Sequence, residues 1–164
     1  MSAAGAVSVR AIRRTEVPRV WALIGELAEF EKLTDILTGS AEALERALFA
    51  EPPVLFGQVA ERDGRIVGYA LFHFTFSSFR TNVRMWLEDL YVEPAARRSG
   101  AGEALLAALV RESLARGCHR VDWDVLEWNP ARAFYERMGA TPSAEGFLKY
   151  GMDAAAMRAL TQKR

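Results

Sequence analysis

The run Arg97-Arg98-Ser99-Gly100-Ala101-Gly102 constrains the fold more than any other part of the 164-residue sequence. It separates an apolar stretch, residues 85–92, from a helical pattern over residues 101–116. This order predicts a strand, a glycine-containing turn and the start of a helix. The unpaired N–H groups of a first helical turn attract anions, and glycine lets the backbone approach them closely. We therefore expect main-chain donors here to bind a diphosphate-bearing ligand.

This turn differs from two common phosphate-binding motifs. The sequence has no G-x-x-x-x-G-K-[ST] loop, and Leu105 stands where a dinucleotide fingerprint needs its third glycine. The remaining pattern, R-x-x-G-x-G, is also compatible with an ordinary strand-to-helix turn whose arginines are solvated. The choice between the two interpretations depends on the rest of the sequence.

Composition excludes several classes of function. The 21 basic and 21 acidic residues balance, so charge gives no basis for nonspecific binding to nucleic acid or to a membrane surface. The single cysteine, Cys118, excludes an intramolecular disulfide and provides no metal-ligand framework. The sequence shows no secretory signal and no apolar run near the roughly 20 residues that span a membrane. We expect a cytoplasmic protein without a metal, folded as a single domain over residues 1–164.

Apolar periodicity and turn residues predict the order β-α-α-β-β-β-α-β-α-β, followed by a short C-terminal helix. The predicted strands cover residues 8–12, 55–62, 65–76, 84–92, 121–126 and 147–152. The predicted helices cover residues 15–31, 40–49, 101–116 and 130–137. Asp63-Gly64 is a strong hairpin signal between the second and third strands. The fold class is α/β (α+β mixed), with helices on both faces of a mixed sheet.

This order, with R-x-x-G-x-G after the fourth strand, resembles the GNAT superfamily of acyl-CoA-dependent N-acyltransferases. A second landmark joins Asn129-Pro130 to Phe134-Tyr135-Glu136-Arg137-Met138-Gly139. It is similar to the asparagine-to-F-Y-x-x-x-G segment of that family, and one helix and one strand separate the two landmarks, as in the family. The resemblance implies acetyl-CoA as co-substrate and a central, largely antiparallel mixed sheet flanked by helices.

Three segments resemble the diamine acetyltransferase subfamily, which includes spermidine/spermine and thialysine N-acetyltransferases. They are residues 26–31, 86–92 and 127–129. This resemblance implies direct transfer, in a ternary complex, to a primary amine of a small cationic molecule: a diamine, a polyamine or a lysine-like amino acid. It also implies a homodimer with substrate sites near the subunit boundary.

Two departures from the subfamily pattern concern the substrate and the start of one helix. The segment from Asn129 to Tyr135 is one residue shorter than in the subfamily. Ser77-Ser78-Phe79 stands where polyamine-specific members carry an acidic residue and a tryptophan. A missing carboxylate weakens the attraction for a distal ammonium group, so a shorter amine or an amino-acid derivative is favoured over a long polyamine.

Acetyl transfer needs a deprotonated amine and a proton for the departing thiolate. Because alkylamines have pKa values of about 10, a base helps near neutral pH. By the resemblance, Glu88 is that base, acting directly or through water, and Tyr135 donates the proton. The alternatives are a solvated strand carboxylate and a packed aromatic ring. Glu88 and Asp89 are adjacent on the predicted strand, so we expect their side chains on opposite faces.

The resemblance also assigns the binding residues. The turn is expected to hold the pyrophosphate and the preceding strand to bind the pantetheine amides, where one N–H group could polarise the thioester carbonyl. The residues expected to bind acetyl-CoA are Leu90, Tyr91, Val92, Arg97, Arg98, Ser99, Gly100, Ala101, Gly102, Asn129 and Arg132. The residues expected to bind the amine are Phe30, Glu31, Glu88, Asp122, Asp124, Glu145 and Phe147. For Arg132 the solvated alternative is favoured, and His73, His119 and Cys118 are expected to be structural.

Two other functions stay open at this level. One is a protein lysine or N-terminal acetyltransferase, against which the compact set of acidic and aromatic candidates argues. The other is a non-catalytic regulatory module that binds acyl-CoA. Glu88 and Tyr135 argue against that module, because a sensor needs neither residue.

Overall fold

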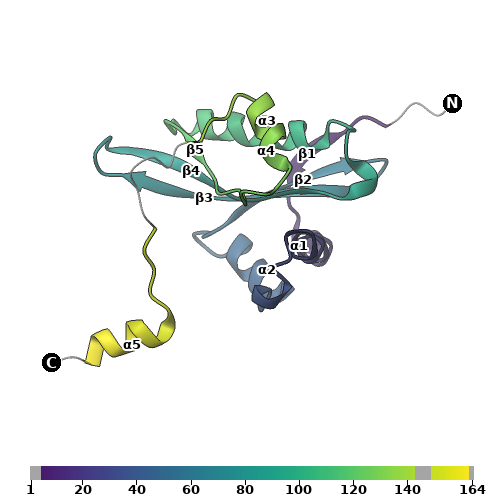
Figure 1. The fold of residues 1–164 in the computed structure, drawn as a ribbon. Coiled ribbons are helices and arrows are strands. Elements are labelled where there is room, and N and C mark those ends of the chain that lie inside the picture. Colours follow the sequence, from purple (N-terminus) through teal and green to yellow (C-terminus); the bar gives the residue numbers. More distant parts are fainter. Residues whose placement is uncertain (1–4, 143–148, 163–164) are drawn as a thin grey trace. The chain divides into compact units, whose positions relative to one another are not determined.

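The structure is a computed structural model that describes residues 5–142 and 149–162. It comprises two compact units, residues 1–130 and residues 131–164. The strands of the first unit are β1 (Ser8–Ala11), β2 (Phe56–Arg62), β3 (Arg65–Ser77), β4 (Asn82–Val92) and β5 (Val121–Asp122). Its α-helices are α1 (Val17–Glu31), α2 (Ala41–Phe49) and α3 (Ala101–Ala115). Figure 1 labels these elements.

The five strands form one sheet in their order along the chain, β1-β2-β3-β4-β5. The first four are antiparallel to their neighbours, whereas β5 pairs with β4 in parallel. The predicted hairpin is present: Asp63 and Gly64 join β2 to β3 with positive φ angles of 51° and 74°. Such angles belong to the tight turns that match the twist of the strands on either side. The expected mixed, largely antiparallel sheet is confirmed.

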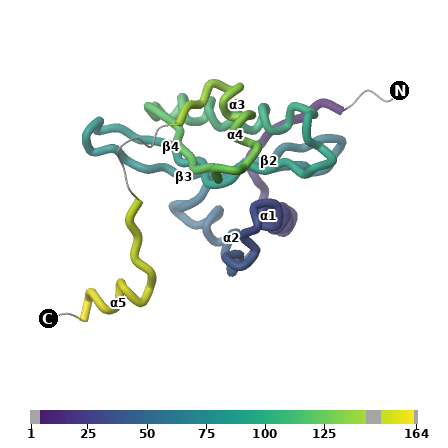
Figure 2. Tube along the Cα trace, in the orientation of Figure 1, coloured from purple at the N-terminus to yellow at the C-terminus, as the bar shows by residue number. Residues whose placement is uncertain are grey.

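Helices cover both faces of this sheet, as predicted. Figures 1 and 2 show α1 and α2 on one face and α3 on the other. Ser40 caps α2 by accepting a hydrogen bond from the N–H group of Ala43 at 3.2 Å. The core beneath α1 and α2 consists of Ile12, Val17, Val20, Leu23, Leu44, Val59, Tyr69, Leu71 and Tyr91. On the opposite face, α3 buries Leu105, Leu106 and Leu109.

Two predicted strands differ from the structure. The strand expected over residues 121–126 ends at Asp122, because only Val121 and Asp122 have partners on β4. The strand expected over residues 147–152 begins outside the described residues. Its described part, residues 149–152, is not a strand. Apolar and β-branched residues do not make a strand where a hydrogen-bonded neighbour is missing.

The second unit contains two short helices. They are α4 (Ala131–Arg137) and α5 (Ala154–Gln162), and both agree with the predicted positions. Gly139, with a φ angle of 92°, follows α4 as expected for a residue that ends a helix. In the described parts of the chain, none of the helices has the length and apolar character needed to cross a membrane.

Candidate active site

The glycine turn links the end of β4 to the start of α3. Arg98 has a φ angle of 65°, and Gly100 has a φ angle of 86° with ψ at 0°. Gly100 is therefore in the left-handed region that glycine adopts without strain. Its conformation directs the chain into α3, whose first N–H groups have no partners within the helix. These groups and the positive end of the helix dipole make the turn chemically suited to an anion.

The side chain of Arg97 contacts the protein. Its Nε donates a hydrogen bond to the carbonyl oxygen of Val92 at 3.1 Å. Its guanidinium lies over the rings of Phe30 and Tyr91, at 5.2 Å and 5.6 Å from their centroids. These contacts hold the turn against the ends of β4 and α1. Of the two arginines expected to contact phosphate, Arg98 is therefore the one better placed to supply a charge.

Ser99 provides a second feature that fits a ligand. Its Oγ is buried and has no hydrogen-bond partner in the structure. An unsatisfied buried hydroxyl costs free energy, and a ligand oxygen at the turn would satisfy it. The turn therefore offers a hydroxyl group as well as main-chain donors.

β4 and β5 separate directly before the predicted pantetheine site. Their pairing covers only Met85 with Val121 and Trp86 with Asp122. Beyond Trp86, no described strand pairs with β4 on that side, whereas β3 continues along the other edge as far as Val92. Residues 90–92 thus lie along an edge of β4 that no described strand covers, and on this edge the carbonyl oxygen of Val92 accepts a hydrogen bond from Arg97. Such an edge accepts an extended ligand that carries amide groups.

A β-bulge at Glu88 corrects the expected orientation of the two adjacent acids. Leu71 of β3 pairs with Asp89 and Phe72 pairs with Leu87, so Glu88 is an extra residue. Both Glu88 and Asp89 therefore lie opposite Leu71, which belongs to the core beneath α1. The prediction of opposite faces was wrong, because an inserted residue interrupts the alternation of side chains.

Glu88 is exposed and lies between two aromatic side chains. The Nε1 of Trp86 donates a hydrogen bond to its Oε2 at 3.0 Å. The Nε2 of His73, on β3, lies 3.6 Å from the same oxygen. The side chain of Glu88 is 54% exposed to solvent, so its carboxylate is accessible to a ligand. His73, which was expected to be structural, thus lies beside the predicted base.

Asp89 is the buried carboxyl group of the site. It accepts a hydrogen bond from the hydroxyl of Tyr69 at 3.3 Å. Burial, and then the negative charge of Glu88, raises the pKa of Asp89 from its ordinary value of 3.8 to about 6. Neither Asp89 nor Tyr69 was among the predicted site residues. Asp89 ends the segment Leu87-Glu88-Asp89, called the L-E-D motif below, whereas the location of Tyr69 follows only from the pairing of β3 with β4.

Glu31, the last residue of α1, is hydrogen-bonded to Asn129. The Nδ2 of Asn129 donates a hydrogen bond to Oε1 of Glu31 at 3.3 Å, and Asn129 is only 6% exposed. Burial raises the pKa of Glu31. The neighbouring Phe30 packs against Trp128 with ring centroids 5.9 Å apart. Two residues predicted for different ligands, Glu31 for the amine and Asn129 for the cofactor, are therefore direct partners.

The remaining predicted residues have different surroundings. Asp122 forms ion pairs with Arg120 at 2.7 Å and with Arg84 at 4.0 Å, so arginines already balance its charge. Asp124 is exposed beyond the end of β5.

Tyr135 and Arg132 lie on α4 of the second unit, where Tyr135 packs against Phe134 with ring centroids 5.2 Å apart. Glu145 and Phe147 lie outside the described residues.

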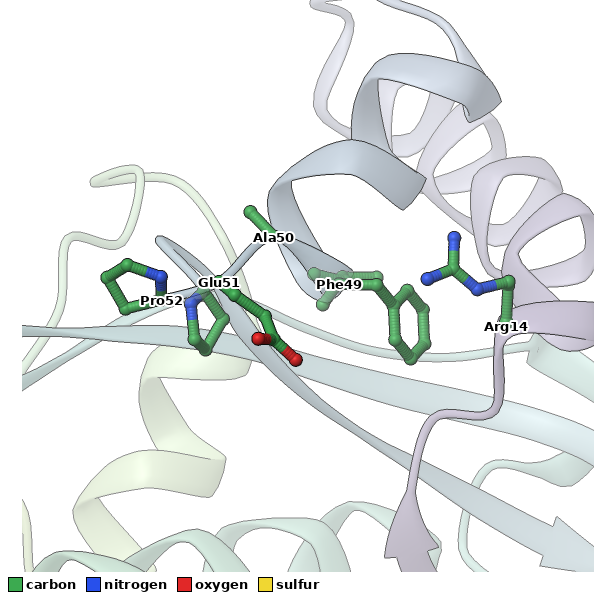
Figure 3. Close-up of a pocket in the computed structure, with 7 residues that line it drawn as sticks. Arg14, Phe49, Ala50, Glu51 and Pro52 are labelled. Carbon is green, nitrogen blue, oxygen red and sulfur yellow. The ribbon is translucent and has the colours of Figure 1, made fainter.

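A separate hollow near the end of α2 shares none of these residues. It measures about 650 Å³ and is shown in Figure 3. It is lined by Arg14, Leu48, Phe49, Ala50, Glu51, Pro52 and Pro53. In the same described ranges, no group of three or more histidine, cysteine or acidic residues is arranged to hold a metal ion.

Comparison with known proteins agrees with this fold. The sequence profile of the Acetyltransferase (GNAT) family matches residues 21–140. A thialysine N-epsilon-acetyltransferase from Bos taurus is 33% identical, covering 96% of this chain and 98% of the relative. An L-ornithine N5-acetyltransferase from Arabidopsis thaliana is 25% identical, covering 80% and 78%. The solved structure of a V. cholerae integron cassette protein has a TM-score of 0.77 at 22% identity, covering 96% and 98%.

The chain belongs to the GNAT family of acetyltransferases. It is an enzyme of the N-acetyltransferase class, and its relatives at about a third identity are thialysine N-epsilon-acetyltransferases of the diamine subfamily. This result confirms the resemblance drawn from the glycine turn and the L-E-D motif. It also argues against the non-catalytic module.

Proposed function

We propose that this enzyme transfers the acetyl group of acetyl-CoA to a primary amine of a small cationic molecule, by direct transfer in a ternary complex. The acceptor class comprises diamines, polyamines and lysine-like amino acids. The observation that carries the proposal is the group of carboxylates made by Glu31 at the end of α1 and by Glu88 and Asp89 at the bulge of β4.

These carboxylates complement a cation. The charges of Glu88 and Glu31 both raise the pKa of Asp89, which means that the three groups act on one another electrostatically. A cationic ligand relieves such repulsion, whereas a neutral ligand does not. Phe30 and Trp128 add an apolar surface beside Glu31, although Arg97 and Lys32 already lie over these two rings at 5.2 Å and 5.8 Å.

Glu88 acts as the base in this proposal. It removes a proton from the substrate ammonium, directly or through water, and the free amine attacks the thioester carbonyl. A C–N bond forms, the C–S bond breaks, and Tyr135 gives its phenolic proton to the thiolate. A phenol with a pKa of about 10 is protonated at neutral pH and can serve as that donor.

Acetyl-CoA is the donor substrate that fits the separated strands and the glycine turn. Arg98, Ser99, Gly100 and the first N–H groups of α3 are proposed to bind the pyrophosphate. The free edge of β4 over residues 90–92 is proposed to bind the pantetheine amides. Arg97 supports this site by holding the turn to Val92. Asn129 and Arg132 are less favoured as direct contacts, since Asn129 is engaged by Glu31.

The acceptor is proposed to be a short amine or an amino-acid derivative. Ser77 ends β3 and Phe79 is fully exposed in the following turn, so that segment supplies no carboxylate for a distal ammonium group. Relatives named for thialysine and for L-ornithine act on amino acids with a side-chain amine, which supports the same choice. The subfamily resemblance further leads us to propose a homodimer, which sedimentation equilibrium tests.

The test is thiol release from acetyl-CoA with a panel of acceptors: thialysine, ornithine, short diamines, spermidine and a basic peptide. We expect the highest kcat/KM with thialysine, ornithine or a short diamine. Turnover confined to the peptide would replace the proposal with a protein acetyltransferase. The absence of turnover with every acceptor would contradict it.

A further inference from the structure

We propose that His73 and Trp86 form a positioning pair for Glu88, holding one oxygen of its carboxylate so that the other faces the amine. This inference rests on the proposed role of Glu88 as the base. It concerns a histidine and a tryptophan to which neither the glycine turn nor the L-E-D motif assigns a role.

The strand register brings the two residues together. His73 of β3 and Trp86 of β4 are direct cross-strand partners, so their side chains lie on the same face of the sheet. Leu71, two residues before His73, belongs to the core beneath α1, which identifies that face. Trp86 precedes Glu88 by two residues, and the bulge follows immediately. The pair therefore stands beside the irregular position at which Glu88 leaves the regular ladder.

Both ring nitrogens lie near the same oxygen, and that of Trp86 donates a hydrogen bond to it. Nε1 of Trp86 is 3.0 Å from Oε2 of Glu88, and Nε2 of His73 is 3.6 Å from it. An exposed glutamate ordinarily samples several rotamers, and fixing it costs conformational entropy. In the folded protein, the hydrogen bond from the rigid indole of Trp86 offsets this entropic cost, and the imidazole of His73 further limits the rotamers of Glu88. Oε1 is then left for the substrate.

The chemistry of the donors matters for a base. A neutral indole N–H orients the carboxylate without supplying the full positive charge that would lower its basicity. A neutral imidazole acts in the same way when Nε2 carries the proton. A lysine or arginine at position 73 would form an ion pair and weaken the base. The observed pair thus orients the Glu88 carboxylate through a neutral indole N–H donor, with an imidazole beside it.

The experiment combines substitutions of His73 and Glu88. His73→Phe removes the ring nitrogen, and His73→Gln replaces it with an amide N–H donor of similar reach. His73 is a third exposed, so both variants should fold, and thermal unfolding checks this. We expect His73→Phe and Trp86→Phe to lower kcat by about 10- to 100-fold through misplacement of the base. The KM for acetyl-CoA should stay unchanged, and His73→Gln should recover most of the loss.

Combination with Glu88→Gln separates the possible failures. If the inference holds, His73→Phe has no further effect on kcat in the Glu88→Gln background, because both changes remove one function. An equal loss in both backgrounds, or full activity of His73→Phe while Glu88→Gln is impaired, would overturn the positioning role alone. Full activity of Glu88→Gln would instead overturn the base assignment of the proposed function.

Discussion

Asn129 donates a hydrogen bond to the carboxylate of Glu31 at 3.3 Å, across 98 residues of sequence. The contact joins the end of α1 to the segment that follows β5. It places a carboxylate beside the aromatic pair of Phe30 and Trp128. A carboxylate held at the edge of an apolar surface attracts an ammonium ion by its charge.

Glu31→Gln tests this part of the amine site. Glutamine keeps an oxygen that accepts from Asn129 but removes the charge. We expect the KM for the amine to rise roughly 10- to 100-fold, since hydrogen bonds to charged groups contribute about 1.5–3 kcal/mol. The KM for acetyl-CoA should be unaffected. Glu29→Gln, an exposed position on the same helix, is the matched control and should change neither constant.

The raised pKa of Asp89 predicts how stability depends on pH. A carboxyl group whose pKa is raised from 3.8 to about 6 holds more protons in the folded chain than in the unfolded chain. Its favourable contribution is complete below pH 3.8 and is lost as the pH rises through about 6. As the pH rises across this window, the free energy of unfolding of Asp89→Asn should therefore increase relative to that of the wild type, by at most about 3 kcal/mol. Urea unfolding of both proteins measures this, and a difference that is independent of pH would refute the cause.

Gly100→Ala tests the conformation of the turn. A β-carbon meets no atom within 4 Å there, so the cost arises from the φ angle of 86°. We expect a loss of about 1–2 kcal/mol in the free energy of unfolding and weaker binding of acetyl-CoA, measured by calorimetry. The control is Gly25→Ala within α1, where a β-carbon also meets nothing. That change should stabilise the helix by about 0.5–1 kcal/mol. Equal effects of the two substitutions would argue against a strained turn.

Tyr135→Phe tests the proton donor. Removal of the hydroxyl should lower kcat by about 100-fold or more while the affinity for CoA is retained, because the hydroxyl acts in the chemical step. Steady-state kinetics and calorimetric titration with CoA separate the two quantities. An unchanged kcat would exclude the assigned role and leave Tyr135 as a packing residue against Phe134.

Local chemistry was sufficient to predict most of the first unit. The Asp63-Gly64 turn requires positive φ angles, and Gly100 begins α3, so both features follow from a few adjacent residues. The L-E-D motif located Glu88 on the correct strand. These predictions succeed because glycine conformation and apolar periodicity depend on neighbours in the sequence.

The bulge at Glu88 could not be predicted in this way. Met85 and Leu87 alternate normally, and a single inserted residue becomes apparent only when β4 is paired with β3. The contact of His73 with Glu88 depends on that same register. The early end of β5 at Asp122 is likewise a property of two strands that separate, although residues 121–126 keep a pattern typical of a strand.

The most direct test of the account is the kcat of Glu88→Gln at saturating acetyl-CoA with the best amine of the panel. Glutamine preserves the shape of the side chain and an oxygen that accepts from Trp86, but it cannot take up a proton. The account predicts that kcat falls by about 100-fold or more near neutral pH, with the KM for acetyl-CoA unchanged. A kcat within about twofold of the wild type, below the smallest effect expected of a base, would contradict it.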